Sequence, residues 1–373
     1  YISKYRVIYF NKKFFVTFFL FLVILIFSSL ISDNYLNSLE HSLFYFRFLF
    51  FSILLSIFIS IYTQVSKYIF FIILFVFAFL VLDSFYQYYF KINLFFQPMY
   101  ENRITSIFGK EFILGSYLSR MLLLFFALAY YGNYNKKYDE IMLVIISLLV
   151  FFIVYLTGER AAILNSLVAI FALTILIRSK KLIKYILFVY SIIIIYLVFF
   201  SNLLINNRII QNTINQVGFF SEDKFFISRA IEGYYLTALN MFYANPFFGV
   251  GPKNYRLNCD NSNYGHLIPL TDNCTNHPHN ILIQILSECG FFAALLFVVF
   301  FIWLGYQMIK KFIICFNNRN NNYKKFEFFI FLSLFLNISP FIPSGNFFNS
   351  WLSSIYYLVF AFIIFNQKLI KIK

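Results

Sequence analysis

The sequence predicts an all-α, polytopic membrane protein of about ten transmembrane helices with one long outer loop, and three observations support this fold class. Of the 373 residues, 61% are hydrophobic and only 12% are charged, whereas about 25% of an ordinary soluble domain is charged. The mean hydropathy is +0.76. These values exclude a soluble enzyme and a disordered chain. They also disfavour a membrane β-barrel, whose alternating strands give a weaker hydropathy signal.

Ten apolar runs bounded by polar residues are the predicted helices, and several are near the lower limit of the roughly 17–25 residues that a span needs. An even number of spans places both termini on one side. The chain then divides into an N-terminal bundle (1–204), a long outer loop (205–280) and C-terminal helices (281–373), within one integrated domain. The runs are Phe14–Ile31, Leu43–Tyr62, Tyr68–Phe85, Ile113–Tyr131, Ile141–Leu156, Ala161–Ile177, Tyr185–Leu204, Ile281–Met308, Phe328–Ile342 and Trp351–Phe365.

The basic residues indicate which side is cytoplasmic. With the N-terminus inside, the inner segments hold 19 of the 30 lysines and arginines and the outer segments hold 9, in agreement with the positive-inside rule. The net charge of +15 therefore belongs to short cytoplasmic loops, and we expect no nucleic-acid partner. No small-residue cleavage site follows the first apolar run, so no cleavable signal peptide is expected.

The first candidate site on the outer side is Thr157-Gly158-Glu159-Arg160, between the fifth and sixth runs. The Arg160 guanidinium is a planar fork of donors suited to phosphate, and the following helix N-terminus would favour an anion. The alternative is an arginine that simply snorkels to the membrane boundary. Arg120 lies within a span, where a charge is costly and is therefore usually paired or functional.

The long outer loop contains a predicted surface helix at about Phe226 to Asn245. Apolar residues recur there at spacings of three and four, as in a helix lying on the membrane, and Arg229 lies near its start. The Gly249-Val250-Gly251-Pro252 that follows is a turn signal. It is too short for a nucleotide-binding fingerprint and follows no strand.

The third candidate site is His277-Pro278-His279-Asn280, which leads into the eighth run. Asn280, Gln284 and Glu288 follow one another at intervals of four and share one helix face. A polar face that enters the bilayer is expected to line a cavity or another helix, with Glu288 deepest, pairing with an arginine or orienting the acceptor. A histidine at its mouth is a candidate general base. The alternative is a solvated loop histidine.

A metal site is a further alternative for His266, His277 and His279, since zinc takes three or four such ligands. His-x-His is a weak signal, however, and no Asp-x-Asp occurs in the chain. We therefore expect no metal and no cofactor, and we expect arginine to balance the charge of any diphosphate.

Four other residues are expected to be structural. Cys259 and Cys274 lie in the same outer loop, and an oxidising compartment would favour a disulfide between them. Arg47 and Asp83 lie at matching depths in the second and third runs, so we expect an ion pair.

Several separated segments resemble, in the same order, the O-antigen ligase family, which also contains O-antigen polymerase-like members. The resemblance covers about residues 100 to 355. The segments are Arg103-Ile-Thr-Ser-Ile-Phe-Gly-Lys-Glu-Phe-Ile-Leu-Gly-Ser-Tyr-Leu118, Gly158-Glu-Arg-Ala-Ala162, Asn245-Pro-Phe-Phe-Gly-Val-Gly-Pro252, His277-Pro-His-Asn280 with Gln284 and Glu288-Cys-Gly290, and Pro343-Ser-Gly-Asn-Phe-Phe-Asn-Ser-Trp351.

The resemblance implies a multi-pass glycosyltransferase of the bacterial inner (cytoplasmic) membrane, with both termini cytoplasmic and the long loop periplasmic. Such an enzyme takes a glycan from undecaprenyl diphosphate and transfers it to lipid A–core on the periplasmic face. Arg160, Arg229 and His279 match the family's catalytic residues and should meet in one cavity. In addition, we expect six residues to bind substrate: Arg103, Arg120, His277, Asn280, Gln284 and Glu288.

Other functions stay open at this point. Within the enzyme class they are an O-antigen polymerase, which joins repeat units, and a protein O-oligosaccharyltransferase. A solute transporter should show inverted repeats and helices broken near the bilayer midplane, and the sequence indicates neither. A binding or scaffold protein would not need a polar helix face converging with arginine and histidine.

Overall fold

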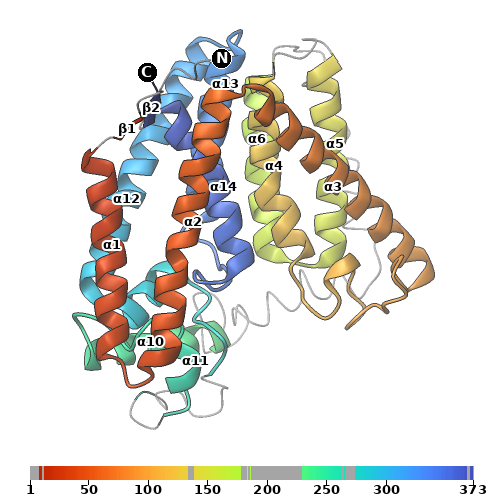
Figure 1. Ribbon diagram of the computed structural model, residues 1–373. Helices are drawn as coiled ribbons and strands as arrows, with labels where there is room; N and C mark the ends of the chain where they lie inside the picture. Colours follow the sequence, from red (N-terminus) through yellow and green to blue (C-terminus); the bar gives the residue numbers. More distant parts are fainter. Residues whose placement is uncertain are drawn as a thin grey trace, which may run out of the picture. The chain divides into compact units, whose positions relative to one another are not determined.

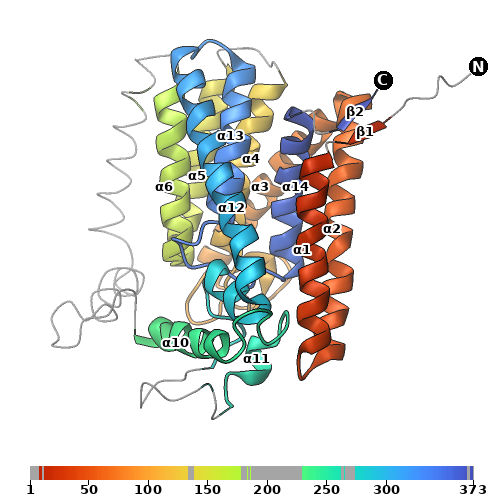
Figure 2. The same ribbon diagram turned by 90° about the vertical axis from the view of Figure 1, so that its left-hand side faces the viewer.

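The computed structural model describes residues 8–10, 12–132, 138–177, 183, 185, 229–261, 264, 274–367 and 370–372. These residues are mainly helical, with two short strands and one 3-10 turn (Figures 1 and 2), which confirms the predicted all-α class. The chain forms two compact units. The first contains Tyr1–Tyr62, Gln216–Tyr306 and Asn337–Lys373, and the second contains Thr63–Asn215 and Gln307–Leu336.

The first unit is built on a layer of apolar helices. α2 packs against both α1 and α14, and the fully buried Tyr45 of α2 contacts the rings of Phe347, Phe348 and Tyr357. Strands β1 and β2 pair antiparallel, Ile8 opposite Ile372, so the first and the last described segments lie side by side. The elements are β1 (Ile8–Phe10), α1 (Lys12–Ile31), α2 (Tyr35–Ile61), α10 (Arg229–Ala244), α11 (Tyr255–Asn258), the larger part of α12 (Ile281–Asn317), α14 (Ser350–Asn366) and β2 (Ile370–Ile372).

Helix α10 is the predicted surface helix, and its axis runs crosswise to the axes of α1 and α2 (Figure 2). Its buried residues Ala238 and Met241 form a small core with Val250, Tyr255 and Cys259. This core packs the 250–259 segment of the long loop onto α10.

The second unit surrounds α4, whose residues Leu118–Tyr130 are all buried, with α3, α5 and α6. Glu140 of α5 and the fully buried Lys325 of α13 form an ion pair at 3.2 Å. The elements are α3 (Gln64–Phe90), η1 (Ser106–Phe108), α4 (Leu114–Tyr131), α5 (Tyr138–Thr157), α6 (Arg160–Leu176), the end of α12 and α13 (Asn322–Asn337).

Helices occupy every predicted apolar run except Tyr185–Leu204, which from residue 186 onward lies outside the described residues. Five described helices, α2, α3, α4, α5 and α12, are long and apolar enough to cross a membrane. Phe15–Ile31 of α1, α6 and α14 are shorter apolar helices. The chain therefore has the helices of a multi-pass membrane protein.

The predicted ion pair between Arg47 and Asp83 was wrong about the partners. Asp83 is fully buried and accepts hydrogen bonds from the Leu94 N–H, at 2.7 Å, and from the Ser106 hydroxyl. Arg47 donates to Ser350 Oγ at 3.0 Å. The prediction rested only on the equal depth of the two residues along their helices. It did not consider the loop after α3, whose Leu94 N–H and Ser106 hydroxyl are the donors to Asp83.

Candidate active site

The His277-Pro278-His279-Asn280 segment lies directly before α12, and His279 has a left-handed backbone with φ of 56°. This conformation is unfavourable for a residue with a side chain, and such strain persists only where surrounding contacts fix it. The Ser344 N–H supplies one such contact, donating to the His279 carbonyl at 2.9 Å. The His279 ring lies 4.2 Å from the His277 ring and 5.8 Å from the Tyr234 ring, centroid to centroid.

Both histidines are held as neutral imidazoles. Burial lowers the pKa of His277 to about 3 and also lowers the pKa of His279. His277 Nε2 lies 3.2 Å from the Ser344 carbonyl oxygen, and because a carbonyl only accepts, that nitrogen carries the proton. His277 Nδ1 is then an acceptor, and it is buried without a hydrogen-bond partner among the described residues.

The polar face at the start of α12 contacts the loop 338–349. The spacing of four had predicted that this face meets another part of the protein or a cavity. Asn280 Nδ2 donates to the Pro340 carbonyl at 2.7 Å. Gln284 accepts from the Phe347 N–H at 2.9 Å and donates to Asn346 Oδ1 at 3.0 Å. Both residues therefore hold this loop against the start of α12.

Sequence reasoning missed Ser344 and Asn346 as residues of this site. Both residues form hydrogen bonds with residues that the sequence analysis did name. Ser344 bonds His277 and His279, and Asn346 bonds Gln284. The available signal was the polar Ser344-Gly345-Asn346 between two apolar helices, which the family resemblance already included.

Glu288, for which pairing with an arginine or orienting the acceptor was expected, holds loop backbone. Its carboxylate is fully buried, accepts from the Tyr255 N–H at 3.1 Å and accepts from Gln284 Nε2 at 2.9 Å. The Lys253 N–H is a further donor to it. A buried carboxylate needs such donors, and here they fix the turn that follows Gly249-Val250-Gly251-Pro252.

Helix α12 is broken at Gly290, where φ is 75° and ψ is −172°. The backbone groups on either side of the break bond to residues 246–251. The Phe291 N–H donates to the Pro246 carbonyl at 2.8 Å, and the Val250 and Gly251 N–H groups donate to Ser287 and Glu288 carbonyls at 2.9 and 2.8 Å. The sequence indicated no broken helix, and this was one of the two arguments against a solute transporter. Because α12 is broken at Gly290, that argument no longer holds.

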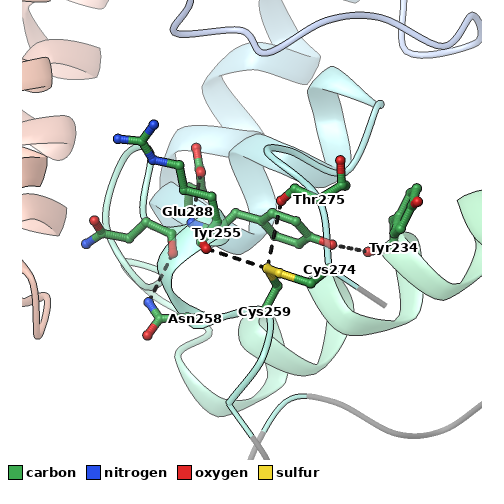
Figure 3. Close-up of a disulfide and its surroundings, with 9 residues drawn as sticks. Tyr234, Tyr255, Asn258, Cys259, Cys274, Thr275 and Glu288 are labelled. Atoms are coloured by element: carbon green, nitrogen blue, oxygen red, sulfur yellow. Dashed lines mark hydrogen bonds between the residues drawn. A yellow bond between two sulfur atoms is a disulfide. The ribbon is translucent and has the colours of Figure 1, made fainter. Parts of the chain in front are cut away.

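A disulfide joins Cys259 to Cys274, with the Cα atoms 5.0 Å apart (Figure 3). It lies beside Tyr255, whose hydroxyl donates to the Tyr234 carbonyl at 3.2 Å (Figure 3). The bridge thereby ties the chain just before His277 to the core that α10 forms.

A second cluster, in the second unit, contains Arg103, Arg120 and Glu159. Glu159 accepts from the Gly115 and Ser116 N–H groups, both at 2.8 Å, and so satisfies two free donors of the α4 N-terminus. Its pKa rises to about 7 because it is buried, although those bonds, Arg103 and Arg120 oppose the rise.

Each arginine of this cluster is buried and fixed by backbone or hydroxyl oxygen. Arg103 Nε donates to the Thr157 carbonyl at 2.9 Å, and its guanidinium lies 3.9 Å from the Phe112 ring centroid. Arg120 Nε donates to Ser116 Oγ at 3.1 Å. Glu159 therefore lies within electrostatic reach of two buried arginines, Arg103 and Arg120.

Arg160 is the first residue of α6 and is exposed. Arg229 is the first residue of α10, and its side chain lies outside the described part, as does all of His266. His279 belongs to the first unit and Arg160 to the second, so their meeting in one cavity stays a prediction.

Comparison with known proteins gives one family match. Residues 145–298 match the model of the family described as O-antigen ligase. No curated protein matches the chain. The matched segment includes Arg160, Arg229 and the whole stretch from His277 to Glu288, whereas the 103–118 and 343–351 segments of the sequence resemblance lie outside it. This family match confirms the resemblance for the part of the chain that it covers.

Proposed function

We propose that this protein is an O-antigen ligase-like glycosyltransferase that moves a polysaccharide from undecaprenyl diphosphate to lipid A–core on the periplasmic face of the inner membrane. The observation that carries the proposal is His279. It is a neutral imidazole in a strained left-handed backbone, at the head of a polar helix face, inside the segment that matches the family.

The proposed chemistry is a single displacement at the anomeric carbon. The acceptor hydroxyl forms the new carbon–oxygen bond, and His279 takes the hydroxyl proton as general base. The bond between the anomeric carbon and the diphosphate oxygen breaks, and the diphosphate leaves with the electron pair. Arg160 and Arg229 balance its charge, with Arg103 and Arg120 adding to the positive field at the membrane boundary.

The assignment of His279 is tested by replacing it with alanine. We expect transfer to fall by about 10²–10⁴-fold, the usual contribution of a positioned general base, while the protein stays in the membrane. His266→Ala is the matched control, from the same loop, and should keep full activity. Full activity in His279→Ala would refute the role, and equal losses in both variants would favour the metal alternative.

The assignment of Arg160 is tested by a conservative substitution. Arg160→Lys keeps the charge but replaces a two-pronged donor with a point charge. We therefore expect it to reduce transfer nearly as much as Arg160→Ala. If lysine restores most of the activity, Arg160 acts only as a charge.

A lipopolysaccharide gel of a deletion strain tests the acceptor. Loss of a ligase leaves bare core, because no polysaccharide reaches lipid A. Loss of a polymerase instead leaves chains of a single repeat, and that pattern would replace the ligase assignment by the polymerase alternative.

The proposed orientation is tested by cysteine labelling from outside the cell. A probe at Asn263 in the long loop should react, and one at Asn321 between α12 and α13 should not. The reverse pattern would contradict both the orientation and a periplasmic site.

A further inference from the structure

The turn at residues 252–256 is held against the start of α2 by two hydrogen bonds. Asn37 Nδ2 donates to Asn254 Oδ1 at 2.9 Å, and Ser38 Oγ donates to the Pro252 carbonyl at 3.1 Å. Lys253 lies between the two attached residues of the turn. One helical turn further along α2, on the same face as Asn37, is His41.

The backbone of this turn is strained at Lys253. Lys253 has a φ of 61°, a left-handed conformation that costs roughly 1–2 kcal/mol for a residue with a side chain. The buried Glu288 carboxylate holds it there through the Lys253 and Tyr255 N–H groups. Two hydrogen bonds to one buried carboxylate thus fix the backbone of the turn that carries Lys253 and Arg256.

The side chains around the turn carry excess positive charge. Lys253 interacts electrostatically with Arg256 and Arg47, which repel its ammonium group, and with the carboxylates of Glu288 and Glu40. The pKa of Lys253 is lowered, mainly by burial and then by Arg256. Since Glu288 is committed to loop backbone, Glu40 is the one exposed carboxylate among these groups.

Within the described part of the chain, protein carboxylates offset this positive charge only in part, through Glu40 and the already hydrogen-bonded Glu288. There, the side chains of Lys253, Arg256 and His41 have no hydrogen bond and no ion pair. Arg47 donates to the neutral Ser350 hydroxyl. Like charges held together without a counterion are unfavourable, and a bound anion would remove that cost.

The surroundings indicate that the anion belongs to a lipid. Leu43 and Phe44, which follow His41 on α2, are 56% and 62% exposed. Tyr35 and Leu36, in the first turn of α2, are also exposed. A headgroup phosphate on the cations would therefore leave its acyl chains beside apolar surface.

We propose that His41, Arg47, Lys253 and Arg256 form a second anion site, which binds a phosphate group of the acceptor glycolipid. This site is separate in sequence from the arginines assigned to the donor diphosphate. The identity of the acceptor rests on the proposed function, but the chemistry of the ligand, a phosphate on a lipid, does not.

A binding experiment with the full chain in detergent tests the site. The probes are a phosphorylated lipid A-type glycolipid, its dephosphorylated form and phosphatidylglycerol. Lys253→Gln/Arg256→Gln should bind the phosphorylated glycolipid about 30-fold more weakly, since each basic residue near a membrane contributes about five-fold to the binding of an anionic lipid. Its binding of the dephosphorylated form should not change.

Two further variants separate this result from misfolding. Glu40→Gln removes the one exposed carboxylate of the cluster and should tighten binding of the phosphorylated form about five-fold. Lys110→Gln, an exposed outer lysine of the second unit, is the matched control and should change nothing. Equal losses for both forms of the glycolipid, no effect of Glu40→Gln, or equal wild-type affinity for phosphatidylglycerol would overturn the proposal.

Transfer kinetics distinguish this proposal from the proposed function. In Lys253→Gln/Arg256→Gln the KM for the phosphorylated acceptor should rise while kcat is kept, because these residues bind the acceptor and do not act on the reacting atoms. A fall in kcat with unchanged KM would contradict the site. If the wild type transfers no glycan at all, the proposed function fails, and the binding experiment still tests the site.

Discussion

Gly290→Ala should destabilise the protein strongly, because this glycine permits both the break in α12 and the close approach of another segment. A Cβ at this position would lie 2.2 Å from the Phe247 carbonyl oxygen, and φ is +75°. Gly109 has a similar φ of +61°, but its Cβ would lie no closer than 3.4 Å to any atom, the nearest belonging to the Gln97 side chain. Gly109→Ala therefore has the conformational cost without the collision.

The expected magnitudes follow from these contacts. A backbone conformation reserved for glycine costs about 1–3 kcal/mol in another residue. To accommodate the new methyl group, the 246–251 segment must move by about 1 Å, which would lengthen its 2.8–2.9 Å hydrogen bonds to the broken helix beyond bonding range. Each lost bond costs about 1 kcal/mol. With three such bonds lost, we expect about 4–6 kcal/mol for Gly290→Ala and about 1–3 kcal/mol for Gly109→Ala.

The assay is unfolding of both variants in mixed micelles of increasing SDS content, followed by tryptophan fluorescence. Trp303 of α12 and Trp351 of α14 are the two tryptophans of the chain, and both lie in the first unit. If Gly290→Ala is no less stable than Gly109→Ala, the 246–251 segment does not stabilise the break, and the reasoning is refuted.

Three further predictions concern stability. Reducing the disulfide between Cys259 and Cys274, which are 15 residues apart, should lower the free energy of unfolding by ~3 kcal/mol, and an unchanged midpoint with dithiothreitol would contradict this. Burial raises the pKa of Glu159 from 4.5 to about 7, so its contribution to stability is full below pH 4.5 and is lost as the pH rises through 7. Unfolding measured at pH 4.5 and 8 should show this loss in the wild type and not in Glu159→Gln. Glu140→Gln should cost ~3–5 kcal/mol in the same unfolding assay by leaving the buried Lys325 without its carboxylate, and Glu140→Leu/Lys325→Met should recover most of it.

Features that depend on spacing along the chain were predictable from the sequence. Apolar runs located the described helices, and the interval of four placed Asn280, Gln284 and Glu288 on one protein-facing side of α12. These patterns work because a helix repeats at short, fixed intervals.

Features that depend on distant partners were not predictable. The spacing did not indicate that Glu288 accepts a hydrogen bond from the Tyr255 N–H, or that Asp83 accepts one from the Leu94 N–H. Gly290 lies in an unbroken apolar run, so composition indicates a continuous helix. The backbone bonds that stabilise the break come from residues 246–251, which are far away in sequence.

The break at Gly290 also has a consequence for hydrophobic length. Ile281–Asn317 has 37 residues, so an unbroken helix would be about 55 Å long, far more than the ~30 Å of a bilayer's hydrocarbon core. The part after the break is about 40 Å long and crosses such a core by itself with some tilt. The short part before it, which carries Gln284 and Glu288, is therefore released from the need to match the membrane's thickness. It can carry polar side chains that a lipid-spanning segment would have to exclude.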